Sequence, residues 1–486
     1  MSHAEAAVSE RLPATYGSLF TLAWPIIVSV ATQAVIGFSD AVLVAELGSA
    51  AVAATSTGAF NSFAILIFPM GILFIVSSFA SQLYGRKDLE GARRYGFYGL
   101  LLSGVTQLFC MVGAMFVPEV LEPLSYEPEV RLLMTSYLQV RLLSGGAAMG
   151  IEALANYYGG IGNTRLPMMA SVLAMVLNVG LDWVLIGGHL GAPALGVTGS
   201  ALASTIASWV AFAALAYRFW RDDPKVPPLY RSELTRMLKF GLPSGFNWFF
   251  EFFAFNVFIN VVVAGLGTVA LAGMMSVLQL NSISFMPAFG LASAGAILVG
   301  QSIGAKDKDG VPRIVGLTLR SAALWQGLVG LFYLLIPELL MRPFAQGKPE
   351  DAAALSAAGA RMLMLSAAWQ LFDATVNTVA EALRAAGDTA FTLKARLVLA
   401  WGLFFPGSWV GVRLLGGTDV QAMLWVVGYL GLLAAVLWWR FKSGKWRELE
   451  LVEPDLGLAA PAPARSEPPG HAEDRSASAT AAARQQ

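Results

Sequence analysis

The strongest constraint on the fold of this chain is a series of apolar segments that recur along nearly its whole length. Each segment has the ~20 apolar residues that a helix needs to cross the ~30 Å hydrocarbon core of a bilayer. Charged residues, Gly/Pro pairs and polar clusters separate the segments. We therefore predict twelve helices, at residues 18–44, 57–83, 95–117, 130–156, 166–186, 197–219, 239–264, 276–301, 315–336, 359–383, 391–412 and 420–441.

The composition excludes an ordinary soluble protein. Charged residues make up 13% of the 486-residue chain, about half of the ~25% found in soluble domains. The 32 basic and 32 acidic residues cancel, so the charge balance gives no basic face for nucleic acid. The chain has one cysteine, Cys110, and three histidines without metal-binding spacing, so the sequence predicts neither an internal disulfide nor a zinc site.

An internal repeat indicates that the chain has two equivalent halves. A shift of 219 residues aligns Gly71 with Gly290, Gln82 with Gln301, Gly85 with Gly304, and Asp88 with Asp307. After a longer connection the shift becomes 225, which aligns Gly162 with Gly387. Each half contains six predicted helices, an even number, so both halves enter the membrane from the same side. Parallel repeats of this kind, related by an axis along the membrane normal, build transporters.

We therefore predict an all-α integral membrane protein, with twelve transmembrane helices in two pseudo-symmetric six-helix lobes around a central cleft. The predicted parts are a polar cytoplasmic N-terminus (1–17), an N-lobe (18–220), a cytoplasmic linker (221–238), a C-lobe (239–442) and a disordered cytoplasmic tail (443–486). Seventeen Lys and Arg residues fall in the even-numbered connections and five in the odd-numbered ones. By the positive-inside rule both termini are cytoplasmic. We expect a monomer in a bacterial-type inner (plasma) membrane.

Four of the acidic residues inside predicted helices lie away from the cytoplasmic helix ends, where an ionisable group costs roughly 2.5–3.5 kcal/mol on insertion scales. They are Asp40, Asp182, Glu251 and Asp373. Glu251 and Asp373 are near the predicted midplane, and Asp40 and Asp182 are at comparable depth in the outer parts of helices one and five. Asn178 lies one helical turn before Asp182 on the same face. The sequence thus predicts two acidic pairs, one in each half.

Two interpretations of these acids remain open. Each acid could have a structural role inside the bundle, and Arg141 in the fourth helix is an available partner for the first pair. The repeat favours a functional role, because none of the four acids has an acidic counterpart at the matching position of the other half.

Buried carboxylates are suited to antiport. Desolvation and a second nearby acid both disfavour the charged form of a carboxyl group. Such a group holds a proton and releases it when another cation arrives, so exclusive occupancy couples the two movements. We predict that Asp40, Asn178, Asp182, Glu251 and Asp373 bind the proton or cation, with no cofactor other than the coupling ion. By helical spacing, Trp369 lies beside Asp373 and Phe255 beside Glu251, where the rings could contact a lipophilic cation.

The sequence resembles the multidrug and toxic compound extrusion (MATE) family over roughly residues 18–441. The matching motifs are Ala23-Trp24-Pro25-Ile26 followed by Asp40, the related loops at 82–85 and 300–304, and Leu383-Arg384-Ala385-Ala386-Gly387-Asp388-Thr389. The resemblance implies two six-helix lobes that form a V-shaped cleft. It also implies export of cationic drugs, the small-molecule partners we expect, in exchange for H⁺ or Na⁺.

The C-lobe acids resemble those of the NorM-like branch of the family, which implies that Na⁺ is an alternative ion at Glu251 and Asp373. In relatives with an N-lobe site, the matching positions are Gln33, Asp40, Asn178 and Asp182, and we include Gln33 in the expected substrate pocket with Phe255 and Trp369. Trp369 stands where some relatives have a tyrosine. The missing hydroxyl favours protons over sodium as the coupling ion.

Other function classes fit the sequence less well. A lipid-linked oligosaccharide exporter of the same two-lobe superfamily is the main alternative, but it would usually need a basic cavity for anionic phosphates. A channel or receptor is disfavoured by the six-plus-six repeat. An enzyme is not expected, because no nucleophile, base and oxyanion-binding group converge in the sequence.

Overall fold

A computed structural model of the protein describes residues 12–344 and 349–452, apart from the side chains of residues 349–351. These residues form helices and connecting loops without a β-strand. Eleven of the described helical segments are long and apolar enough to cross a membrane. The all-α membrane fold is therefore as predicted, and the protein is a multi-pass membrane protein.

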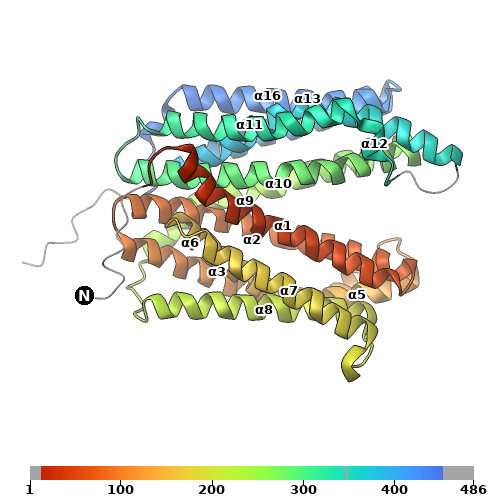
Figure 1. Cartoon of the computed structure of the whole chain (residues 1–486), viewed down its shortest axis with the longest axis horizontal. Helices are drawn as coiled ribbons and strands as arrows, with labels where there is room; N and C mark the ends of the chain where they lie inside the picture. The colour runs from red at the N-terminus through yellow and green to blue at the C-terminus, as the bar shows by residue number, and fades with distance from the viewer. Residues whose placement is uncertain (1–11, 345–348, 453–486) are drawn as a thin grey trace, which may run out of the picture. The chain divides into compact units, whose positions relative to one another are not determined.

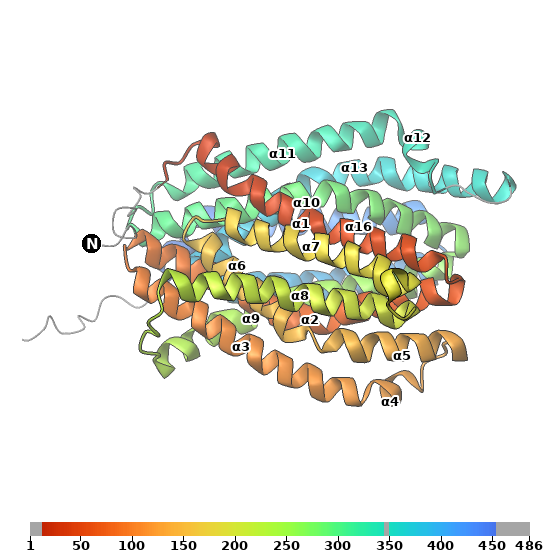
Figure 2. The ribbon, with the colours of Figure 1, turned by 60° about the horizontal axis from the view of Figure 1, so that its bottom comes forward.

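The described part of the N-terminal half contains eight α-helices. They are α1 (Tyr16–Ala45), α2 (Ser49–Gly85), α3 (Leu89–Met115), α4 (Val117–Leu121), α5 (Pro128–Leu142), α6 (Gly145–Gly160), α7 (Arg165–Gly187) and α8 (Gly196–Asp222), with a 3-10 turn, η2, at His189–Gly191. Figure 2 shows α1, α7 and α8 side by side, and each is in contact with the next.

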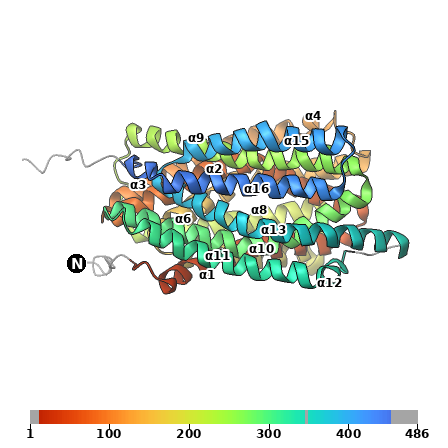
Figure 3. The same cartoon turned by 90° about the horizontal axis from the view of Figure 1, so that it is seen from above.

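The C-terminal half repeats this arrangement with more interruptions. Its helices are α9 (Arg231–Val257), η3 (Phe258–Val263), η4 (Ala264–Leu266), α10 (Thr268–Gly304), α11 (Val311–Leu335), α12 (Pro337–Met341), α13 (Pro349–Ala386), α14 (Thr389–Leu397), η5 (Val398–Phe404), α15 (Phe405–Ser408), η6 (Trp409–Leu414), α16 (Asp419–Lys442) and η7 (Lys445–Glu448). Seen from above, α11, α13 and α16 lie side by side (Figure 3).

Backbone geometry at related positions supports the two-lobe repeat. Gly48 and Gly267 have φ angles of 105° and 103°, and Lys87 and Lys306 have φ angles of 65° and 61°. The positive φ of a lysine is uncommon, so its occurrence at related positions is informative. The two halves therefore share loop conformations as well as the order of their helices.

The halves meet mainly through α1, α2, α9 and α10, and α6 and α13 make smaller contacts with the opposite half (Figure 1). α2 packs on α9 and α10 packs on α1. Glycines permit the close approach: a Cβ atom at Gly71 would lie 2.8 Å from the Cα of Gly245. The repeat-related Gly290 would place a Cβ atom 3.2 Å from the backbone nitrogen of Ile27.

The predicted fourth helix is interrupted. α5 ends at Leu142 and α6 begins at Gly145, because Ser144 departs from helical geometry, with φ −105° and ψ 8°. Helix α8 binds the carbonyls freed by the break: Thr205 Oγ1 donates to Val140 O at 3.1 Å, and Trp209 Nε1 donates to Leu143 O at 3.1 Å. Irregular backbone at membrane depth is tolerated where protein groups satisfy it in this way.

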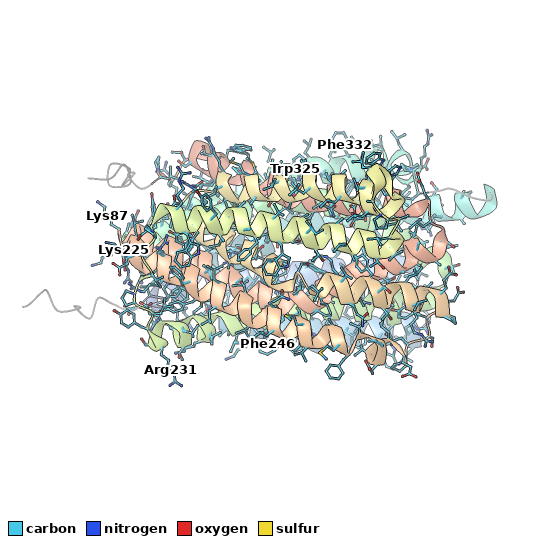
Figure 4. The ribbon with its side chains drawn as sticks, turned by 90° about the horizontal axis from the view of Figure 1, so that it is seen from below. Lys87, Lys225, Arg231, Phe246, Trp325 and Phe332 are labelled. Carbon is cyan, nitrogen blue, oxygen red and sulfur yellow. The ribbon has the colours of Figure 1, made fainter. Side chains whose placement is uncertain are left out.

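The surface separates into a basic end and apolar flanks. Lys87, Lys225 and Arg231 lie towards the same end of the helices, whereas Phe246, Trp325 and Phe332 lie along their length (Figure 4). Phe332 is 49% exposed, as expected of a side chain that faces lipid rather than water. We refer to the end that holds Lys87 and Lys225 as the basic end.

The predicted disordered tail begins too early. Residues 445–448 form η7, and Trp446 is buried with its ring stacked on Phe441 at a centroid distance of 5.6 Å. Trp446 and Leu451 are apolar and buried, although the composition of the segment as a whole is polar. The predictions for residues 1–11 and 453–486 lie outside the described residues.

Candidate functional site

The N-lobe acids come together between α1 and α7. Asp40, Asn178 and Asp182 are all buried, and the carboxyl groups of Asp40 and Asp182 are close enough to interact electrostatically. Asn178 Nδ2 donates to Ser204 Oγ of α8 at 3.0 Å. This is the arrangement that helical spacing predicts for the first acidic pair.

This cluster has more acceptors than donors. Asp40 Oδ1, both carboxyl oxygens of Asp182 and Asn178 Oδ1 have no hydrogen-bond partner among the described residues. Ionised carboxylates only accept hydrogen bonds, so two of them in contact repel each other unless a donor or cation is present. The geometry therefore suits a proton held between the carboxyl groups or a small cation bound by both.

Arg141 stands next to this cluster, at the interruption between α5 and α6. Its charge is close enough to interact electrostatically with the carboxyl of Asp40 and with the hydroxyl of Tyr137. Its Nη1 donates to Ser144 Oγ, and Ser144 Oγ donates to the carbonyl of Arg141 at 2.8 Å. Arg141, the structural partner considered for the acids, is thus hydrogen-bonded at the helix break rather than to a carboxylate.

Asp373 lies on α13 in a separate, amide-rich environment. Gln326 Nε2 of α11 donates to Asp373 Oδ2 at 2.7 Å, and Asn377 Nδ2 donates to the backbone carbonyl of Asp373 at 3.0 Å. No basic side chain among the described residues forms an ion pair with Asp373. No protein cation among the described residues is therefore placed to compensate a negative charge on this carboxyl group.

The expected pairing of Glu251 with Asp373 is not formed. Glu251 of α9 instead makes an ion pair with Arg396 of α14, a residue near the start of the predicted helix at 391–412. α14 begins at Thr389 after the N-cap Asp388, which carries Arg396 into the bundle, where it is buried. The role of Glu251 and Asp373 as ion-binding residues stays a prediction.

The three expected pocket residues lie on different helices and are not brought together. Gln33 is exposed on α1, and Phe255 of α9 packs against Phe258 at a centroid distance of 6.1 Å. Trp369 is buried in the C-lobe, where its Nε1 donates to Asn281 Oδ1 at 3.1 Å. Its indole is therefore engaged in packing within the lobe.

An aromatic seam that the sequence analysis missed joins the two lobes. Phe252 of α9 lies 5.2 Å from Phe60 and 5.7 Å from Phe63 of α2, measured between ring centroids. Closer to the basic end, Trp248 lies 5.4 Å from Phe74 and 5.8 Å from Phe289. The signal in the sequence is the aromatic run from Phe246 to Phe255.

Two related hydrogen bonds join the lobes near the basic end. Gln82 Nε2 donates to the carbonyl of Ala385 at 2.7 Å, and Gln301 Nε2 donates to the carbonyl of Gly160 at 3.1 Å. The glutamines correspond under the 219-residue shift, and the acceptors correspond under the 225-residue shift. We call these two bonds the glutamine latch.

Arg384 adds a charged contact near the latch. Its guanidinium bonds to Glu381 of its own helix and crosses the lobe boundary to the carbonyl of Phe74 and, at 3.3 Å, to Ser78 Oγ. Arg384 and Glu381 are both buried. These contacts hold the lobes together near the basic end.

The sequence profile of the MatE family matches residues 25–184 and 243–410. The chain is 26% identical over 423 residues to the multidrug resistance protein NorM of Aliivibrio fischeri, with 85% of this chain and 89% of that protein covered. It is 29% identical over 433 residues to the probable multidrug resistance protein NorM of Chromobacterium violaceum, with 85% and 87% covered.

Solved structures show the same fold. A transporter of the MOP superfamily from Pyrococcus furiosus superposes with a TM-score of 0.80 at 18% identity, covering 89% of this chain and 96% of that one. An outward-facing multidrug resistance MATE family transporter superposes with a TM-score of 0.79 at 18% identity, covering 89% and 96%.

Proposed function

The chain belongs to the MATE family, in its NorM-like branch, and on this basis we propose that it is a secondary active multidrug efflux antiporter. It exports cationic or amphipathic organic compounds in exchange for H⁺, with Na⁺ as the alternative coupling ion. The observation that carries the proposal is the pair of facing carboxyl groups at Asp40 and Asp182, in which Asp40 Oδ1 and both oxygens of Asp182 lack donors among the described residues.

Antiport follows from competition for these carboxylates. A proton, a sodium ion or an organic cation can each bind at the pair, and they compete for the same carboxyl oxygens. Unit charges about 4 Å apart interact by about 4 kcal/mol at an effective dielectric constant of 20. That energy is enough for one cation to displace another when the lobes change the side of the membrane to which the site is open.

Protons are favoured over sodium in the C-lobe. Sodium needs several oxygen ligands, whereas Glu251 is already paired with Arg396 and Asp373 receives an amide N–H from Gln326. An amide nitrogen that donates to the carboxylate competes with a metal ion for the same lone pairs. A proton requires one free lone pair and no coordination shell.

The aromatic seam supports a lipophilic cation as the substrate. Phe60, Phe63 and Phe252 present aromatic faces at the junction of the lobes, and Phe60 and Phe63 are each more than 40% exposed. Aromatic faces attract organic cations through the ring quadrupole. The seam offers this contact without fixed hydrogen-bond geometry, which suits compounds of different shapes.

The remaining assignments extend the same proposal. The chain acts as a transporter and not as an enzyme, and it uses no cofactor besides the coupling ion. It resides as a monomer in a bacterial inner membrane, with the basic end and both termini on the cytoplasmic side, in accord with the positive-inside rule.

The test uses purified protein in proteoliposomes and tetraphenylphosphonium as the substrate. A pH gradient without a sodium gradient should drive transport, and a sodium gradient alone should not. Asp182→Asn should abolish proton-driven exchange, whereas Asn61→Asp, which adds a carboxylate elsewhere in the N-lobe, controls for a change of charge. Transport driven by sodium alone would reverse the choice of ion, and undiminished exchange by Asp182→Asn would remove this site from the mechanism.

A further inference from the structure

The N-lobe cluster contains two acidic groups and one basic group. Asp40 comes from α1, Asp182 from α7 and Arg141 from the last turn of α5. Tyr137, one turn before Arg141, is a further titratable group in the field of all three. With both carboxyls ionised the net charge is −1, and a single proton or monovalent cation makes the cluster neutral.

Arg141 is held beside the carboxyls without being paired to either. Its guanidinium donates to Ser144 Oγ, and no ion pair joins it to an acid within residues 12–344 and 349–452. The helix break that carries Ser144 is fixed from α8 by Thr205 and Trp209. The positive charge is therefore anchored at one place, while the oxygens of Asp182 stay available.

We propose that Arg141 is a fixed internal countercharge that limits the Asp40–Asp182 site to one elementary positive charge in each transport cycle. This inference rests on the antiport function proposed above. Its first consequence is stoichiometric, because the site releases one proton for each monocationic substrate. Its second consequence is selectivity, because a dication at the pair leaves an excess positive charge in apolar surroundings.

The effect on selectivity should be readily measurable. Unit charges about 4 Å apart change a binding constant by at least ~10-fold at the effective dielectric constant of a protein interior. Removing the charge of Arg141 leaves two carboxylates, which two protons or one dication can neutralise. The site of such a variant should then accept both.

A structural role for Arg141 makes a different prediction. Arg141→Gln removes the charge but keeps a donor that can reach towards Ser144 Oγ, and Arg141→Lys keeps the charge but loses the planar guanidinium. If the charge matters, the lysine variant should behave like the wild type and the glutamine variant should not. If the packing of the helix break matters, both variants should be impaired in parallel.

The stoichiometry is measured with the full chain in proteoliposomes at zero membrane potential, with decamethonium as the probe, because a dication replaces two protons only at a site that holds two. The drug gradient that stops net flux at a gradient of one pH unit should be about 10-fold for one proton per drug and about 100-fold for two. We expect the lower value for the wild type and Arg141→Lys, and the higher value for Arg141→Gln. A one-proton balance in Arg141→Gln would overturn the inference.

Selectivity is measured by comparing decamethonium, a dication, with decyltrimethylammonium. Arg141→Gln should raise the ratio of dication to monocation affinity by about 10-fold or more. Should Arg141→Gln fail to fold, the wild type and Arg141→Lys still test the proposal, because both must bind the dication more weakly than the matched monocation. Equal affinities would overturn it.

Asp182→Asn in the same assay separates this inference from the proposed function. Loss of exchange in Asp182→Asn together with the two-proton balance in Arg141→Gln supports both. Loss of exchange in Asp182→Asn with an unchanged balance in Arg141→Gln overturns the countercharge and leaves the antiport site in place. Undiminished exchange in Asp182→Asn overturns both.

Discussion

Removing the glutamine latch should shift the protein towards the conformation that is open at the basic end. Gly160 and Ala385 lie at the C-terminal ends of α6 and α13, where helix carbonyls lack intrahelical partners. Gln82 and Gln301 supply those carbonyls with donors from the opposite lobe. In Gln82→Ala and Gln301→Ala each carbonyl loses its donor while the lobes remain closed.

The size of the shift follows from the two bonds. Leaving a buried hydrogen-bonding group unsatisfied costs about 1–3 kcal/mol, so the double variant loses about 2–6 kcal/mol in the closed state. Since 1.4 kcal/mol is a factor of about ten, the lower limit is already a ~30-fold shift in the equilibrium. Because the bonds are repeat-related, each single variant should give about half of the free energy.

The measurement is a pulsed electron paramagnetic resonance distance between spin labels at Lys87→Cys and Lys306→Cys, which are exposed and repeat-related. The background is Cys110→Ala, since Cys110 is the only cysteine in the sequence. Gln279→Ala, an exposed position on α10, is the matched control. Distance distributions in the double variant that are the same as in the control would refute the role of the latch.

Three further predictions concern the charge pairs, the helix break and the seam. Glu251→Gln should lower the free energy of unfolding by about 3–5 kcal/mol, because it leaves the charge of the buried Arg396 uncompensated. Adding Arg396→Met should restore most of this loss, as measured by thermal unfolding. Equal melting temperatures of Glu251→Gln and the wild type would contradict a stabilising role of the ion pair. Trp209→Phe should cost about 1–3 kcal/mol by leaving the carbonyl of Leu143 without its donor, measured in the same way against the exposed control Trp183→Phe. Phe252→Ala should weaken binding of tetraphenylphosphonium by about 0.5–2 kcal/mol without changing the coupling stoichiometry, and unchanged affinity would exclude the seam from the substrate path.

The fold and one of the two acidic pairs could be predicted from the sequence. Apolar segments of bilayer length and a repeat with a constant register determine an all-α two-lobe fold. The pair formed by Asp40 and Asp182 could also be anticipated, because both lie at similar depth and Asn178 shares the face of Asp182. For these features, spacing along the chain contains the required information.

The remaining site features depend on contacts between distant segments. Arg396 lies near the start of the predicted helix at 391–412, and its pairing with Glu251 depends on how α14 packs on α9. Trp369 is correctly placed one turn before Asp373, but its indole points to Asn281, 88 residues away in the sequence. The break at Ser144 is also hidden, because small residues are common in unbroken membrane helices.

The central claim is that an organic cation and the coupling ion compete for the same buried carboxylates. It is tested most directly by adding tetraphenylphosphonium to purified protein in weakly buffered detergent solution and counting the protons released per cation bound. The account predicts release of about one proton at the N-lobe site in the wild type, and none from that site when Asp40 and Asp182 are both replaced by asparagine. Binding of tetraphenylphosphonium that releases neither protons nor sodium ions would contradict it.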